Sequence, residues 1–250
     1  MGQDVKVDRS LVFQGDAAQY PNVKGDMSPE RMTEVDWYDQ AALDTTNDYV
    51  QTLGGSSDLG AVIGGGENGF KGTTGNVDND VAFLATPLIF DITQNPAIET
   101  KLKLADVSGT IVFWGFSDAT SESTPAATID ADSGTLTAAA NDACGFLVDA
   151  DYNTSILYCV SVLTAGTPQV VTSKIDGTNV TWTDGQSKIL KVELDTTGNA
   201  NFFCDGVQVG RILLAVADVP LCEILNYGTR ANDGSNIVTK RYLKKWQDIP

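Results

Sequence analysis

Short segments in which apolar and polar side chains alternate recur through most of the chain, and this alternation is the strongest constraint on its fold. In the segment 98–104, Ile98, Leu102 and Leu104 share one face while charged side chains occupy the other. The segment 188–194 alternates in the same way. A period of two residues is that of a half-buried β-strand, because successive side chains of a strand point to opposite faces. The sequence therefore predicts an all-β protein.

Turn residues between the alternating segments predict antiparallel pairing. Asp205-Gly206 separates the segment 199–204 from the segment 207–214. Asp-Gly between two apolar runs is a strong hairpin signal, because both residues tolerate the positive φ of a type I′ turn. We therefore expect an antiparallel β-sandwich. Its strands are predicted at 81–92, 97–105, 110–118, 144–149, 154–164, 168–175, 187–195, 199–204, 207–214, 221–228 and 236–243.

Composition narrows the partners and the compartment. The 250 residues carry a formal net charge of −17. Binding to nucleic acid or to an anionic membrane needs a surplus of Lys and Arg, so neither is expected as a partner. The start Met1–Lys6 lacks the apolar core of a signal peptide, and no apolar run is long enough to span a membrane. We expect a protein that is made in a cytoplasm.

The absence of histidine excludes much of catalysis. A chain with no His cannot form a Ser-His-Asp triad, a Cys-His pair or a His-based metal site. The four cysteines, at 144, 159, 204 and 222, form no C-x-x-C pair. We expect them to be reduced core residues, and we predict no cofactor. Carboxylate chemistry is the catalysis that remains open to this chain.

The chain divides into an arm and a sandwich. Residues 1–54 carry few strand signals and form a predicted N-terminal arm. Within it, Ser28-Pro29-Glu30 resembles a helix start, and apolar residues then recur at helical spacing, which predicts one short helix. The β-sandwich domain spans 55–250 and begins with a Gly-rich lead-in, 55–80. The segment 120–141 is expected to be a long connection.

Two kinds of ligand motif occur, and each has a simpler interpretation. Gly64–Gly69 matches G-x-G-x-x-G, but no helix start follows to meet a pyrophosphate, so we interpret it as a flexible loop. Asp149, Asp151 and Asn153 space oxygen atoms as calcium loops do, as does the segment 76–80. Both lack the glycine and glutamate of an EF-hand loop. They are weak calcium candidates, and turn-forming residues are the alternative.

Two further features suggest contact with another surface. The segment 110–116 is apolar on both faces, with Trp114 on one of them, so a second layer has to cover it. That cover is either the chain's own arm or loops, or a second subunit. A basic end on an acidic chain, comprising Lys240, Arg241, Lys244 and Lys245, either meets an acidic neighbour or forms a solvated strand.

These segments carry a family resemblance. Residues 98–118, 144–151 and 188–209 resemble the concanavalin A-like jelly roll, and more narrowly the version found in structural proteins of tailed bacteriophages, including capsid decoration (cement) proteins. The resemblance covers residues 80–246 and is one of strand pattern. The chain departs from the catalytic members of that fold, since it lacks the E-x-D-x-E carboxylates of the glucanases and the histidine of the lyases. The resemblance therefore implies that the chain is not an enzyme.

The resemblance implies a virion structural protein that binds the outer surface of a phage head and stabilises contacts between capsomers. The implied partners are the major capsid protein and further copies of this chain, for example in a trimer, and the implied location is the capsid surface. The residues expected at these interfaces are Trp37, Tyr38, Tyr49, Trp114, Lys240, Arg241, Lys244 and Lys245.

Two alternatives remain open at this stage. One is a carbohydrate-binding or receptor-binding domain of a phage tail or fibre protein, which would use an exposed aromatic such as Trp182 to stack on sugars. The other is a glycoside hydrolase whose carboxylate pair has no recognisable motif.

Overall fold

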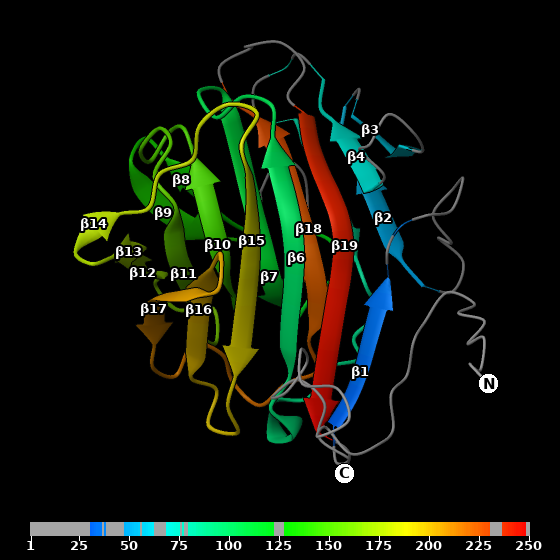
Figure 1. Cartoon of the computed structure of the whole chain (residues 1–250), viewed down its shortest axis with the longest axis vertical. Helices are drawn as coiled ribbons and strands as arrows, with labels where there is room; N and C mark the ends of the chain where they lie inside the picture. The colour runs from blue at the N-terminus through cyan, green and yellow to red at the C-terminus, as the bar shows by residue number, and fades with distance from the viewer. Residues whose placement is uncertain are drawn as a thin grey trace, which may run out of the picture.

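The computed structural model describes residues 31–36, 38, 48–55, 57–62, 69–75, 77, 80–122, 128–230 and 237–248. In these residues two antiparallel sheets lie face to face, with the main apolar core between them (Figure 1). The helical content is one 3₁₀ turn, Ile92–Gln94, among the described residues. None of the described helices has the length and apolarity to cross a membrane. The predicted all-β antiparallel sandwich is confirmed.

The first sheet has eight strands, and strand β19 lies near its middle. The order is β17-β16-β15-β6-β19-β4-β3, and β1 also pairs with β19. β4 pairs with the first part of β19 and β1 with the last part, so the two lie end to end along one side of that strand. The bounds are β1 Arg31–Asp36, β3 Asp58–Val62, β4 Gly69–Thr73, β6 Ala97–Leu104, β15 Ser187–Leu194, β16 Ala200–Cys204, β17 Val207–Ile212 and β19 Ile237–Asp248.

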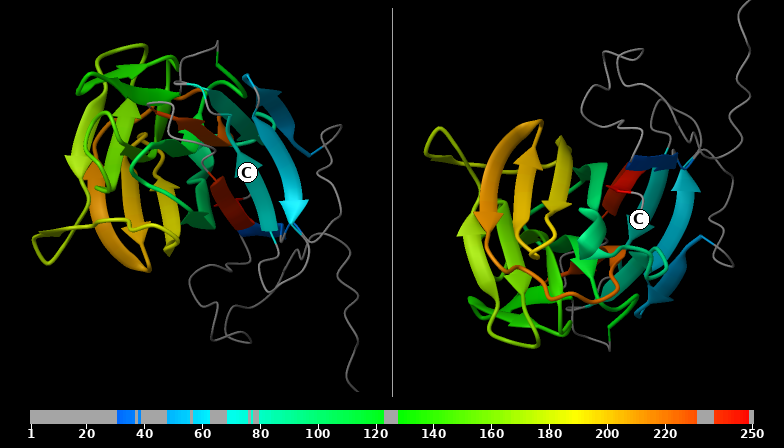
Figure 2. Two further views of the ribbon diagram at one scale, coloured as in Figure 1. Left: turned by 90° about the horizontal axis from the view of Figure 1, so that it is seen from above. Right: turned by 90° about the horizontal axis from the view of Figure 1, so that it is seen from below.

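The second sheet has seven strands and carries the candidate site. Its order is β12-β11-β10-β7-β18-β5-β2, so β7 is the central strand. Two small hairpins, β8–β9 and β13–β14, complete the fold. The end-on views show the two sheets as separate curved layers (Figure 2). The bounds are β2 Val50–Leu53, β5 Val81–Ala85, β7 Thr110–Ser117, β8 Ile129–Asp132, β9 Thr135–Ala138, β10 Ala143–Asp149, β11 Tyr158–Val162, β12 Gln169–Thr172, β13 Lys174–Ile175, β14 Thr178–Asn179 and β18 Cys222–Thr229.

The sequence pattern explains the strands that were predicted. Along β6, Ile98, Leu102 and Leu104 are buried while the intervening charged side chains are partly exposed, and β15 alternates in the same way. Asp205 and Gly206 both have positive φ, 50° and 81°, and join β16 directly to β17. The hairpin predicted from this dipeptide is confirmed.

Three segments differ from expectation, two near the N-terminus and one in the middle of the chain. Arg31–Asp36, predicted to begin a helix, forms strand β1, because pairing with β19 satisfies its backbone groups. The predicted lead-in contains β3 and β4, and the predicted long connection contains the hairpin β8–β9. Two strands of the segment 1–54 thus belong to the two sheets. The division into an arm and a sandwich stays a prediction.

Candidate functional site

Strand β7 is buried on both faces, as its sequence predicts. Val112, Trp114 and Phe116 point into the core between the sheets, whereas Ile111 and Phe113 belong to a second apolar cluster on the outer face of the seven-stranded sheet. Ile129 of the hairpin β8–β9 and nearby side chains complete this second cluster. The sequence left two candidates to cover this face: the chain's own arm or loops, or a second subunit. Among the described residues the chain itself provides the cover, because its hairpin β8–β9 packs over the outer face.

The described residues place no row of carboxylates on the outer face of this sheet. β10 presents Ala143, Gly145 and Leu147 on this face before it reaches Asp149. Gly145 lies opposite Gly115 of β7, where an added Cβ would come within 2.4 Å of backbone atoms of the neighbouring strand. This face is therefore packed rather than equipped for chemistry.

Asp149, the first calcium candidate, is paired with an arginine. Its Oδ1 accepts from Arg230 Nε at 3.1 Å, and its Oδ2 accepts from Arg230 Nη2 at 2.7 Å. Asp149 is fully buried, and its Oδ2 also accepts from the backbone N–H of Ala131. A guanidinium thus occupies the position that a cation at Asp149 would need. Among the described residues, no three His, Cys, Asp or Glu side chains gather around a common centre.

Four of the predicted interface residues meet inside the molecule instead. Trp114 Nε1 donates to Glu223 Oε1 at 2.5 Å, and Lys240 Nζ donates to the same oxygen at 2.5 Å. Lys240 Nζ also lies 5.4 Å from the ring centre of Tyr38, which packs against Tyr49. All five side chains are buried, so in this structure none of them forms an outer surface.

The remaining interface candidates lie on β19 or outside the described residues. Lys245 pairs with Glu34 of β1 at 3.3 Å, and Lys244 lies 4.9 Å from the ring centre of Trp246. Arg241 is partly exposed, and Trp37 lies outside the described residues. Two residues of the basic end therefore meet acidic neighbours within the same chain: Lys245 pairs with Glu34 on β1, and Lys240 pairs with Glu223 on β18.

A pair of carboxylates stands where β7 ends. Asp118 follows the last residue of β7, and Glu122 lies four positions further along. Glu122 Oε1 and Asp118 Oδ1 are both shielded from solvent and have no hydrogen-bond partner among the described residues. Partial burial, with the added negative charge of Asp118, raises the pKa of Glu122 to about 7. One carboxylic acid near neutrality beside a second carboxylate is the arrangement that general acid–base catalysis uses.

Neighbouring groups fix the backbone at Asp118 and Ala119. The backbone N–H of Asp118 donates to the carbonyl of Asp142 at 2.9 Å. The thiol of Cys222 lies within 3.2 Å of the Ala119 carbonyl, and Ser117 Oγ accepts from the backbone N–H of Ala119. Asp142 itself accepts from two backbone N–H groups, so its carboxylate is a structural group.

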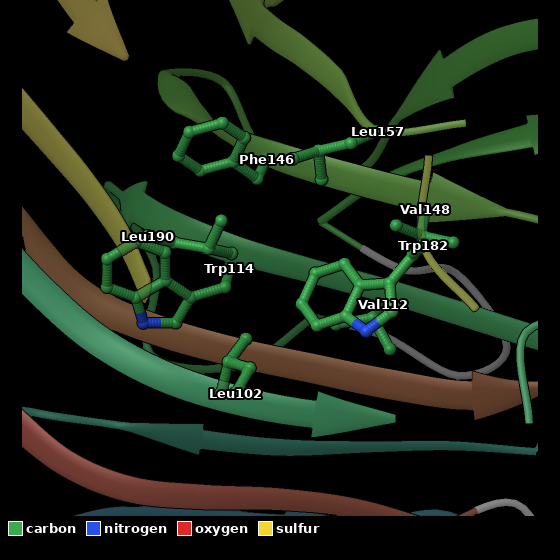
Figure 3. A pocket seen from close by; sticks show the side chains of 8 residues that line it. All are labelled: Leu102, Val112, Trp114, Phe146, Val148, Leu157, Trp182 and Leu190. Atoms are coloured by element: carbon green, nitrogen blue, oxygen red, sulfur yellow. The ribbon is translucent and has the colours of Figure 1, made fainter. Parts of the chain in front are cut away.

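Trp182, the expected sugar-stacking residue, is buried in the core. Its exposed fraction is 1%, and its Nε1 donates to the carbonyl of Gln186. The ring lines a small cavity between the sheets (Figure 3). That cavity measures about 10 Å³ and has apolar walls, so it is barely large enough for one water and offers a sugar no polar contact. Its walls are formed by Leu102, Val112, Trp114, Phe146, Val148, Leu157, Trp182 and Leu190.

The four cysteines are buried, as predicted, and are free thiols. Burial raises the pKa of all four, which keeps them in the unreactive thiol form. None of them is therefore a candidate nucleophile.

Comparison with known proteins places the fold. No protein-family model matches the chain, and no curated protein matches its sequence. A glycoside hydrolase family 16 endo-glucanase from Bacteroides ovatus superimposes with a TM-score of 0.60 at 10% identity, over 84% of this chain and 98% of that chain. A laminarinase catalytic domain from Thermotoga petrophila gives 0.55 at 14% identity, over 86% and 96%. The cellulose-induced protein Cip1 gives 0.55 at 12% identity, over 84% and 95%.

The chain has the concanavalin A-like jelly-roll fold. The predicted capsid decoration protein is contradicted by these neighbours, which are glycan-degrading enzymes and a cellulose-induced protein. The prediction of a non-enzyme is contradicted as well, because related sandwiches carry hydrolases and a transglycosylase. The predicted viral, virion and cement roles depend on the capsid prediction, so they are contradicted too. The strand pattern misled because it belongs to the fold, whereas function belongs to sites placed on the fold. The predicted self-association stays a prediction.

Sequence reasoning missed the residues that now stand out. Glu223 is the one charged residue in the otherwise apolar segment 221–225, and that isolation was a readable signal of a buried pair. Asp118 and Glu122 carried a weaker signal, because they sit among Ser, Thr and Ala in a segment that reads as a loop.

Proposed function

We propose that the chain is a glycoside hydrolase in which Glu122 and Asp118 are the catalytic carboxylates. The observation that carries the proposal is the pair itself: a glutamic acid whose pKa is raised to about 7, next to an aspartate. Each has a shielded oxygen with no hydrogen-bond partner among the described residues. The neighbours with known chemistry on this fold include endo-glucanases, which supports a polysaccharide as the substrate.

Each carboxylate has a distinct task in this mechanism. Glu122 is protonated near neutral pH and donates its proton to the oxygen of the departing sugar. Asp118, in its ionised form, either attacks the anomeric carbon or takes a proton from the attacking water. The histidine-free sequence is compatible with this chemistry, because glycoside hydrolysis needs two carboxyl groups and no imidazole.

A carbohydrate-binding role without catalysis has less support. Such modules bind sugars on exposed aromatic faces. The large apolar side chains that are well exposed among the described residues are Val, Leu and Ile, with no Trp, Tyr or Phe. The carboxylate pair therefore favours hydrolysis over binding within the carbohydrate-related functions.

The test is hydrolysis of a panel of β-glucans and other neutral polysaccharides by the purified chain, followed as released reducing ends. We expect kcat/KM to fall as the pH rises above about 7, because Glu122 then loses the proton it must donate. E122Q and D118N should each reduce kcat by roughly 10²-fold or more, in line with the loss of a positioned acid or base.

The matched control is E193Q, which removes a partly exposed carboxylate that pairs with Lys191 on the other sheet. It should leave kcat unchanged. Turnover that survives both E122Q and D118N would refute the assignment of these residues, and the absence of turnover on every glycan would refute the proposed activity.

A further inference from the structure

The buried pair Lys240–Glu223 carries an inference that is independent of the proposed hydrolase. Glu223 lies on β18 of the seven-stranded sheet and Lys240 on β19 of the eight-stranded sheet, so the pair joins the two layers of the sandwich. Both side chains have no exposed surface, and Nζ lies 2.5 Å from Oε1. Each of the two strands is hydrogen-bonded to neighbours on both sides, so the backbones that carry the two groups cannot move apart without disturbing both sheets.

As an ion pair this contact is poorly satisfied. Glu223 Oε1 accepts two hydrogen bonds, but Oε2 is buried with no partner among the described residues. The ammonium of Lys240 has three protons, and Glu223 Oε1 is the acceptor that the described residues provide. A buried ion pair is stable only when its remaining lone pairs and protons are also hydrogen-bonded. An unmet carboxylate oxygen and an under-used ammonium are therefore costly in this position.

We propose that Lys240 and Glu223 condense to an intramolecular amide that covalently links the two sheets. The Lys240 Nζ–Glu223 Cδ bond forms and the Cδ–Oε2 bond breaks. Oε2 leaves as water with the two protons that the ammonium loses, so the step needs no oxidant, reductant or co-reactant. The product removes two buried charges together with the unpartnered oxygen, and it keeps Oε1 as the amide carbonyl.

The surroundings favour each stage of this reaction. Burial lowers the pKa of Lys240, which favours the neutral amine that has to attack. Trp114 Nε1 donates to Oε1, the oxygen that carries negative charge in the tetrahedral intermediate, so it serves as a one-donor oxyanion site. Intramolecular reactants that are well oriented reach effective concentrations of about 10⁵–10⁸ M, so contact between the two buried groups helps to offset the low reactivity of a carboxylic acid. The register between β19 and β6 shifts just after Lys240, and such irregularities often re-aim a side chain.

The test is the intact mass of the full chain, measured under denaturing conditions. We expect the wild-type protein to be lighter than its sequence by one water molecule. K240R should have its full sequence mass, because a guanidinium stays protonated and does not attack. E223Q should form the same amide and lose one ammonia molecule instead, so its final mass should equal that of the wild type.

K240R also controls for another loss of water, since the sequence contains Asp-Gly pairs at 176–177, 184–185, 205–206 and 233–234 that can cyclise. A loss of water that persists in K240R belongs to those sites and overturns the proposal, as does a wild-type chain of full sequence mass.

Tryptic digestion locates the bond. The amide blocks cleavage after Lys240 and links the peptide 212–230 to the peptide 231–241. Fragmentation spectra distinguish this linked pair from an uncleaved chain. If the wild-type protein yields free peptide 231–240 and no linked pair, the proposal fails.

Discussion

At the scale of single residues, the most informative groups are the buried polar atoms that have no hydrogen-bond partner among the described residues. Most buried polar atoms in a protein have a hydrogen-bond partner, so each exception calls for a reason. Here the exceptions include oxygens of Asp118, Glu122 and Glu223. The first two support a catalytic pair, and the third supports a covalent link. By contrast, Asp149 and Asp142, whose oxygens are occupied, are interpreted as structural groups.

The raised pKa of Glu122 predicts a pH-dependent cost in stability. A carboxyl group whose pKa is higher in the folded chain than in the unfolded chain favours folding at low pH, and this contribution is lost as the pH rises through the folded-state value. For Glu122 the window runs from its ordinary pKa of 4.5 to about 7. E122Q should therefore match the wild type in its urea midpoint near pH 4 and exceed it at pH 8. An equal difference at both pH values would show that ionisation of Glu122 is not the cause, and E193Q serves as the control for loss of a charge.

At the scale of elements, β7 and β10 approach closely at Gly115 and Gly145, which predicts that a larger side chain at Gly115 destabilises the fold. A Cβ at Gly115 would lie 2.2 Å from the carbonyl oxygen of Cys144, which is backbone and cannot rotate away. G115A should therefore destabilise the chain by about 1–3 kcal/mol or more, as overpacking of a core does. Equilibrium unfolding in urea measures this loss. T135A, at an exposed position of β9, should stay within about 0.5 kcal/mol of the wild type. A G115A chain of wild-type stability would mean that the two strands are further apart than described.

The elements also show what sequence can and cannot predict. Strands such as β6 and β15 were predictable because a half-buried strand alternates apolar and polar side chains, and this alternation is visible in the sequence. Strands β1 and β4 were not, because their pairing with β19 comes from a distant segment and leaves little local pattern. The burial of Trp182 was missed for a similar reason. Its turn-rich segment suggests an exposed side chain, whereas long-range packing between the sheets buries the ring. The carboxylate pair depends on burial and shared charge, which spacing does not encode.

At the scale of the whole molecule, the N-terminal strands decide whether the sandwich is an independent unit. β1 and β2 each extend one of the sheets, and Tyr38 and Tyr49 are buried in the core between them. Deletion of residues 1–54 should therefore lower the melting temperature and broaden the transition, because it exposes core surface and leaves the last part of β19 with one neighbour. Circular dichroism melts of the full and truncated chains measure this. A sharp melt at the wild-type temperature would instead establish the segment 1–54 as a separate arm.

The position of β19 has a consequence for the order of assembly during folding. β19 lies between β6 on one side and β4 and β1 on the other, yet all three partners come from the first half of the chain. On a ribosome, those three strands emerge long before the strand that joins them. Such long-range pairing slows folding, because the entropy cost of closing large loops comes before the stabilising contacts form. The eight-stranded sheet is therefore completed only after synthesis has passed residue 248, and until then the edges of β4 and β6 remain open to a chaperone or to a second nascent chain.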